Sequence, residues 1–142
     1  MPKFSIVARI LALDYGKKRT GIAVTDELQI IASGLTTVAT EELLPFLTAY
    51  IEKESVERII VGEPKQMDGS ASQSEELIIP FIKKLQQQFP QVPVERQDER
   101  FTSKMAVRTM IDGGLKKKKR QDKAMVDQIS ATLILQSYLD RK

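Results

Sequence analysis

Short runs of hydrophobic residues, separated by turn-forming residues, dominate the first forty positions of the chain. Residues 8–14 (ARILALD) form an apolar run that leads into a turn at Gly16, and residues 20–25 and 29–38 have the composition of strands. The links between these segments are short, which favours antiparallel pairing. We therefore expect a meander of three hairpin-linked strands.

The hydrophobic period changes at Thr40, where apolar residues begin to recur every three or four positions. This spacing predicts a helix whose apolar stripe contains Leu43, Leu44, Leu47, Tyr50 and Ile51. Residues 57–62 then predict a short buried strand that ends in a glycine-containing loop. A second helix is expected over 72–89, with Ser72 and Glu75 in capping-box spacing and Pro80 kinking or splitting it.

The second half of the chain continues the alternation of strands and helices. Residues 93–97 predict a strand, residues 102–112 a helix that stops at the following glycine pair, and residues from the Asp122 cap to about 139 a final helix. The whole order predicts one α/β domain over residues 1–142. Its mixed five-stranded sheet would combine a three-strand antiparallel meander with two parallel strands, flanked by helices.

Two residue types are missing from this chain, and their absence limits its chemistry. With no cysteine, disulfides, thiolate catalysis and zinc–thiolate sites are excluded. With no histidine, the usual general base and the commonest ligand of transition metals are excluded as well. A catalytic metal would need oxygen ligands, which favours Mg²⁺ or Mn²⁺. The sequence shows no signal peptide and no membrane-spanning run, so we expect a cytoplasmic protein.

The net charge of +3 comes from one short segment. Residues 116–123 contain six of the 22 basic residues and one of the 19 acidic ones, which leaves 16 basic and 18 acidic residues elsewhere. A block of this kind predicts a mobile basic loop that binds a polyanion. A solvated loop without a partner is the alternative interpretation.

Asp14 is the first carboxylate of interest, because it ends an otherwise apolar strand. A carboxylate in such a place is costly unless it is paired or bound to a metal. The alternative is an aspartate that caps the tight turn at Gly16 with its own side chain. Lys17, Lys18 and Arg19 follow at the expected hairpin tip, where they could contact a phosphate backbone.

Asp127 lies on the predicted last helix, on the face that also contains Ala131, Ile134 and Tyr138. That face is apolar except for Asp127, which suggests that the carboxylate points toward the sheet. The alternative is an acidic residue that is favoured simply by the helix N-terminus.

The pair Asp98-Glu99 follows the strand 93–97. Alternation along a strand sends neighbouring side chains to opposite faces, so only one of the two should join Asp14. Spacing alone does not choose between them, and an exposed acidic turn is the alternative. Two carboxylates ~4 Å apart repel by about 4 kcal/mol at an effective dielectric constant of ~20, so a cluster of three would need a cation. Such a site could hold two divalent ions for phosphodiester hydrolysis.

Five motifs in order resemble those of the YqgF family of Holliday junction resolvase-like and pre-16S rRNA nucleases, which have an RNase H-like fold. They are DYGKKRTGIAV (14–24), VGEP (61–64), MDG (67–69), DERFTS (98–103) and VDQISATLILQSYL (126–139). The resemblance spans about residues 9–139. It implies that Asp14, Glu99 and Asp127 are catalytic and bind the metal, and it selects Glu99 over Asp98. This chain departs from the family by having Glu63 where an apolar residue is usual, which leaves the role of that loop open.

Further basic residues could contact a nucleic acid. Arg100, Lys104 and Arg108 lie four apart, so a helix would place them on one face. The run Lys116, Lys117, Lys118, Lys119 and Arg120 would extend this track, and a solvated helix face is the alternative.

The leading functional hypothesis is a metal-dependent nuclease acting on structured nucleic acid. The resemblance implies processing of the 5′ end of pre-16S rRNA or resolution of branched DNA, by a monomer or a homodimer, and the sequence does not separate these. Two hypotheses of other classes are an ATP-binding phosphotransferase, which can share the fold, and a nucleic-acid-binding factor without turnover.

Overall fold

The structure is a computed structural model that describes residues 8–65, 73–99 and 123–141. Several predicted features lie outside these ranges. They are the helix at 102–112, residues 116–122 of the basic loop 116–123, and the proposed caps Ser72 and Asp122.

The described strands form one five-stranded sheet in the order β3-β2-β1-β4-β5. Three of them pair antiparallel in sequence, while β4 lies parallel to β1 and β5 lies parallel to β4. This arrangement confirms the predicted meander followed by two parallel strands. The strands are β1 (Arg9–Asp14), β2 (Arg19–Thr25), β3 (Ala32–Ala39), β4 (Val56–Glu63) and β5 (Val94–Asp98).

The third strand begins later than the sequence predicted, because residues 26–31 form an ordered loop. The Asp26 carboxylate accepts hydrogen bonds from the backbone amides of Leu28, Ile30 and Ile31, at 3.1, 2.8 and 2.7 Å. Gln29 has a φ of 60°, in the left-handed region that a strand does not use. The expectation of a strand from residue 29 was therefore wrong at its first three residues.

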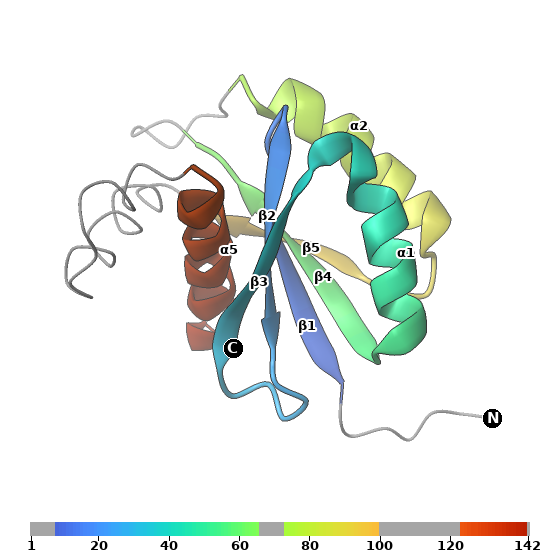
Figure 1. The fold of residues 1–142 in the computed structure, drawn as a ribbon, viewed down its shortest axis with the longest axis vertical. Helices are drawn as coiled ribbons and strands as arrows, with labels where there is room; N and C mark the ends of the chain where they lie inside the picture. The colour runs from blue at the N-terminus through green and yellow to red at the C-terminus, as the bar shows by residue number, and fades with distance from the viewer. Residues whose placement is uncertain (1–7, 66–72, 100–122, 142) are drawn as a thin grey trace.

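Helices cover both faces of the sheet (Figure 1). The first face packs against α1 (Leu43–Lys53), which follows the short 3₁₀ turn η1 (Thr40–Glu42), and against α2 (Glu75–Gln88). The second face packs against α5 (Lys123–Asp140). None of these described helices is long and apolar enough to cross a membrane.

Helix α2 starts later than predicted and continues through Pro80. Its N-cap is Ser74, which makes no side-chain capping bond. Of the two effects expected of Pro80, a kink or a split, the split does not occur, since the proline removes a single backbone hydrogen bond and the helix continues through it. Ile78 and Leu85, on either side of it, are buried in the same core and hold both halves of the helix against the sheet.

The alternation of side chains produces two separate cores. In β1, Leu11 and Leu13 belong to the core under α1 and α2, whereas Ile10 and Ala12 belong to the core under α5. The next residue of the second series is Asp14, which alternation therefore directs toward α5.

Candidate functional site

The end of β1 meets a glycine on its neighbouring strand. Asp14 is paired with Gly21 of β2 in the antiparallel register. A Cβ atom built on Gly21 would overlap the backbone carbonyl of Asp127 in α5. Only glycine allows this close approach of the helix to the strand. The glycine thus brings Asp127, near the start of α5, next to the strand pair that carries Asp14.

A second glycine, Gly62 of β4, allows a similarly close contact on the other side of β1. The backbone amide of Glu99 donates to the carbonyl of Glu63 at 3.2 Å, which extends the pairing of β5 with β4 by one residue. The Glu99 carboxylate then lies over Gly62, where a Cβ would overlap Oε2 of Glu99 and lie 2.7 Å from Cδ1 of Ile134. Because Ile134 belongs to α5, Glu99 lies on the α5 face of the sheet.

The neighbouring Asp98 belongs to the opposite face. Arg96, two residues earlier, pairs with Glu75 of α2 at 2.5 Å, so alternation directs Asp98 toward α2 as well. The two acids therefore diverge as the sequence predicted, and Glu99 is the member that shares a face with Asp14.

The acidic groups on the α5 face have strongly shifted pKa values. Burial, and after it the negative charge of Asp127, raises the pKa of Asp14 to about 7. Burial, and after it the charge of Asp14, raises the pKa of Glu99 to about 9. Each shift indicates negative charge that the protein leaves without full compensation, which a cation would relieve.

Asp26 provides the contrast for the turn-capping interpretation of Asp14. Its pKa is lowered, mainly by hydrogen bonds from the backbone amides of Ile31, Ile30 and Leu28. An aspartate that caps a turn behaves in this way. The raised pKa of Asp14 argues against that role for the first carboxylate.

Arg19 has a different position from the one that the sequence suggested. It begins β2, and its Nε donates to Oδ2 of Asp127 at 2.5 Å. Lys17 and Lys18, the other two basic residues expected to contact nucleic acid here, are exposed, whereas Arg19 is half-buried. Arg19 supplies a positive charge beside Asp127, and its contact with nucleic acid stays a prediction.

Among residues 8–65, 73–99 and 123–141, no group of three acidic side chains is arranged so that it could hold a metal ion. The chemistry of the available donors nevertheless fits Mg²⁺ or Mn²⁺, since all of them are oxygens. The amide oxygen Oε1 of Gln97 adds to this set, because it is buried without a hydrogen-bond partner in the described part of the chain. Gln97 is paired with Gly62. It comes two residues before Glu99 in the chain, so the two side chains lie on the same face of the sheet.

Sequence reasoning missed Arg96, which holds the ends of β4 and β5 together. Its guanidinium donates to the carbonyls of Val61 at 3.1 Å and Gly62 at 2.9 Å, in addition to its pair with Glu75. The available signal was a basic residue in the middle of the predicted strand 93–97, since such a residue needs a partner where the strand is buried.

The remaining predicted residues fall into two groups. Glu63, the departure from the family pattern, lies 3.8 Å from Lys65 in an ion pair, so part of its charge is balanced within its own loop. The other predicted nucleic-acid contacts lie outside the described residues: Arg100, Lys104, Arg108, Lys116, Lys117, Lys118, Lys119 and Arg120.

Comparison with known proteins places this arrangement in a family. Residues 8–141 match the family model described as RuvX: Holliday junction resolvase. A protein of Christiangramia forsetii named "Putative pre-16S rRNA nuclease" is 68% identical over 133 residues, which cover 94% of this chain and 98% of the relative. A protein of Porphyromonas gingivalis with the same name is 56% identical over 134 residues, covering 94% and 97% of the two chains.

A solved structure confirms the fold. The structure described as "T. thermophilus RuvC in complex with Holliday junction substrate" matches 94% of this chain and 96% of its own chain with a TM-score of 0.51. At 18% sequence identity this likeness concerns the architecture alone, which is RNase H-like. Taken with the match over residues 8–141, these findings show that the chain belongs to the RuvX (YqgF) family of Holliday junction resolvase-like nucleases, enzymes that act on phosphodiester bonds.

Proposed function

We propose that this protein cleaves structured nucleic acid with a divalent cation held by Asp14, Glu99 and Asp127, and that its substrate is the 5′ region of pre-16S rRNA. The observation that carries the proposal is the position of Asp14 on the α5 face, where its pKa is raised to about 7 by burial and by the charge of Asp127, while burial and the charge of Asp14 raise the pKa of Glu99 to about 9. The three carboxylates are not yet arranged as a metal site, so a cation would have to draw them together. Charge of this kind, close to a sheet end, is what a cation-dependent hydrolase requires.

The three carboxylates would have distinct tasks in binding the cation. Asp14, at the end of the rigid strand β1, provides the fixed ligand, and Glu99 closes the site from β5. Asp127 must exchange Arg19, its present partner, for the ion. When bound, a divalent ion would activate water and stabilise the leaving oxygen of the phosphodiester. Binding also requires loss of the protons that Asp14 and Glu99 retain at neutral pH.

The choice of substrate rests on the relatives. Proteins that match almost the whole chain carry the name of a nuclease of pre-16S rRNA. The family description instead names Holliday junction resolvase, so a four-way junction is the second candidate. A junction resolvase cuts two strands and needs two sites, whereas trimming RNA requires only a monomer. Maturation of rRNA also agrees with a cytoplasmic location.

The decisive experiment compares two labelled substrates, the 5′ leader of pre-16S rRNA and a four-way DNA junction, in Mg²⁺ and in Mn²⁺. Asp14→Asn should reduce cleavage by at least about a hundredfold while leaving the protein folded. Asp26→Asn is the matched control, because Asp26 is also a half-buried aspartate at a strand end but its carboxylate is bound by backbone amides and its pKa is lowered. Its activity should equal that of the wild type.

Each outcome has a clear meaning. Cleavage of the RNA leader alone supports the proposal. Cleavage of the junction alone would mean that the substrate is branched DNA, while the proposed carboxylate site would stand. Equal rates for the wild type and Asp14→Asn would exclude Asp14 from the chemistry. The same assay with ATP and no nucleic acid tests the phosphotransferase hypothesis, for which release of phosphate is the expected signal.

A further inference from the structure

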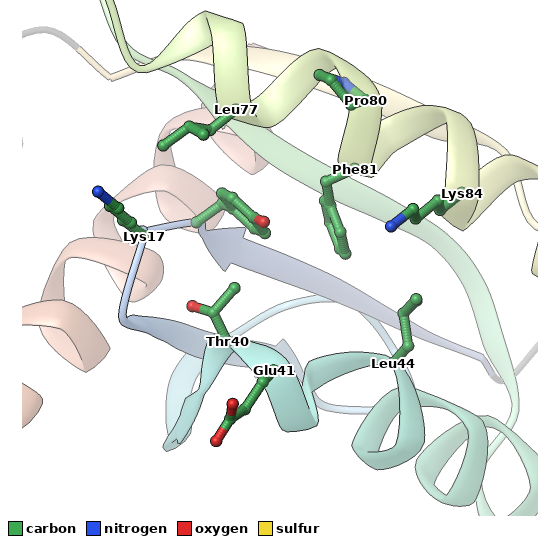
Figure 2. Close-up of a pocket in the computed structure, with 9 residues that line it drawn as sticks. Lys17, Thr40, Glu41, Leu44, Leu77, Pro80, Phe81 and Lys84 are labelled. Carbon is green, nitrogen blue, oxygen red and sulfur yellow. The ribbon is translucent and has the colours of Figure 1, made fainter.

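The face of the sheet opposite the carboxylates contains a hollow of about 390 Å³ at the same end of β1. It opens between the β1–β2 turn, η1 with the start of α1, and helix α2 (Figure 2). Its volume lies in the range of sites that bind small organic groups. The residues that line it are Tyr15, Lys17, Thr40, Glu41, Leu44, Leu77, Pro80, Phe81 and Lys84.

Aromatic rings form the inner wall of this hollow. Tyr15 stacks on Phe81 of α2, with ring centroids 4.5 Å apart and an angle of 27° between the planes. The Tyr15 hydroxyl makes no hydrogen bond within the described part of the chain, and Tyr15 directly follows Asp14. Leu77 lines the hollow as well, and its side chain is 47% exposed, so an apolar surface at this side remains open to a ligand.

Charged groups stand at the edges of the hollow. Lys17 comes from the β1–β2 turn and Lys84 from α2, and Figure 2 shows their amino groups at opposite ends of the aromatic wall. Glu41 lies on the side formed by η1. A cation at each end suits a phosphate-linked ligand, and a carboxylate can accept a hydrogen bond from an exocyclic amino group of a base.

We propose that this hollow binds one unpaired nucleotide of the substrate strand, next to the cleavage site. The base would pack on Tyr15, Phe81 and Leu77, as bases of single strands pack on aromatic and apolar side chains. Lys17 and Lys84 would contact the phosphates on either side. This inference deepens the proposed function and rests on it, because it assigns a path to the strand that the carboxylates cut.

The path of the substrate strand follows from the order of residues at the end of β1 and in the turn after it. Asp14 points to the α5 face and Tyr15 to the α2 face, so a strand that crosses the turn 15–18 meets both in succession. Lys17 and Lys18 lie exposed on that turn, beneath such a strand. Single-stranded RNA flanking a cleavage point can bend into a hollow of this depth, whereas bases of a continuous duplex remain stacked on each other.

The chain offers two matched pairs of variants for the test. Lys84→Glu and Lys83→Glu reverse neighbouring exposed lysines of α2, of which only Lys84 lines the hollow. Leu77→Ala and Ile79→Ala shorten two side chains of α2 that are both 47% exposed, of which only Leu77 lines it. All four positions are on the surface, so the fold is retained and can be checked by circular dichroism.

Binding is measured in the Asp14→Asn background, which prevents cleavage, by fluorescence anisotropy of a labelled single-stranded RNA and of the same sequence as a duplex. Lys84→Glu should weaken single-strand binding about tenfold and flatten the slope of log affinity against log salt by about one unit. Leu77→Ala should weaken it roughly fivefold. Lys83→Glu and Ile79→Ala should change it less than twofold, and duplex binding should not distinguish either pair.

Equal effects within each pair, or equal losses for duplex and single strand, would overturn the inference. Because the measurement records binding and not cleavage, it is independent of whether the carboxylates are catalytic. If the wild type cleaves but the two members of each pair bind alike, the proposed nucleotide site in the hollow is wrong and the nuclease activity stands. A wild type that does not cleave, combined with pairs that differ, retains the hollow as a single-strand site and rejects the nuclease.

Discussion

The two faces of the sheet come from alternate residues of the same strands but present different kinds of surface at the carboxyl end of β1. On the face covered by α1 and α2, Leu13, Ile22 and Val61 lie side by side and are fully buried. On the face covered by α5, the corresponding positions are Asp14, Gly21 and Gly62. The face under α1 and α2 is packed with large aliphatic side chains, whereas the glycines of the face under α5 let polar groups come close to the backbone.

This difference shows how a small sheet can carry a charged site without losing its core. The large aliphatic side chains of one face supply the burial that stabilises the fold. The glycines of the other face let α5 and the Glu99 carboxylate approach so closely that Asp14 and Glu99 lose solvent. Four changes, taken from the largest expected effect to the smallest, test whether the α5 face carries the charged site while the opposite face carries the stabilising core.

Glu99 and Asp98 are adjacent acids on opposite faces, so they should respond differently to neutralisation. Glu99→Gln should lower metal-dependent cleavage by at least about a hundredfold and weaken Mn²⁺ binding. Asp98→Asn should retain cleavage and mainly lower stability. Cleavage rates, Mn²⁺ titration calorimetry and urea unfolding of both variants measure this. If Asp98→Asn were the inactive variant, the roles of the two acids would have to be exchanged.

Glycines on the α5 face should differ according to what their Cβ would meet. Gly21→Ala forces a Cβ into the backbone of Asp127, which cannot yield without moving α5, so we expect a loss of about 2–3 kcal/mol in the free energy of unfolding. At Gly34 the three atoms nearest to a new Cβ all belong to the Gln128 side chain, which can rotate away, so Gly34→Ala should cost less than about 1 kcal/mol. Urea denaturation separates them, and equal losses would argue against a close contact at Gly21.

The stability of the protein without metal should depend on pH in a direction set by the α5 face. The folded protein holds protons on Asp14 up to a pKa of about 7 and on Glu99 up to about 9, whereas the unfolded chain releases them near 3.8 and 4.5. Between about pH 4 and pH 9 the folded state therefore binds more protons, and stability should fall as pH rises.

Melting curves in EDTA at several pH values, for the wild type and for Asp14→Asn, measure this effect. The variant should be more stable than the wild type at pH 8 by ~1–2 kcal/mol, less than the full pKa shift would give, because Asp14 is half-buried and solvent still screens part of its charge. At pH 4 the difference should vanish. A wild type that becomes more stable between pH 5 and pH 8 without metal would contradict the burial of these groups.

Arg19 occupies the place beside Asp127 that a cation would need, so removing it should favour metal binding. The pair is partly exposed, and partly exposed pairs contribute about 0.2–1 kcal/mol, so Arg19→Gln should tighten Mn²⁺ binding only up to about fivefold. Lys18→Gln is the control, because it removes an equal charge from the neighbouring residue without breaking this ion pair. An equal change in both variants would assign the effect to general electrostatics.

The amino-acid sequence alone determined the order of the elements and the kind of chemistry. The hydrophobic period separates strands from helices locally, and the short links between the first three strands favour the antiparallel pairing that the structure shows. The absence of histidine and cysteine restricted the site to oxygen ligands. Alternation along β5 also predicted that Asp98 and Glu99 diverge, because that property depends only on the backbone of one strand.

Only the tertiary structure decided which groups meet across elements. The partner of Arg19 is Asp127, a residue of the last helix, and no local pattern connects the two. The position of Glu99 over Gly62 and the fit of Tyr15 against Phe81 likewise depend on how β5 and α2 dock on the sheet. Such contacts arise from packing of segments far apart in the chain, and periodicity, which describes one segment at a time, contains no information about them.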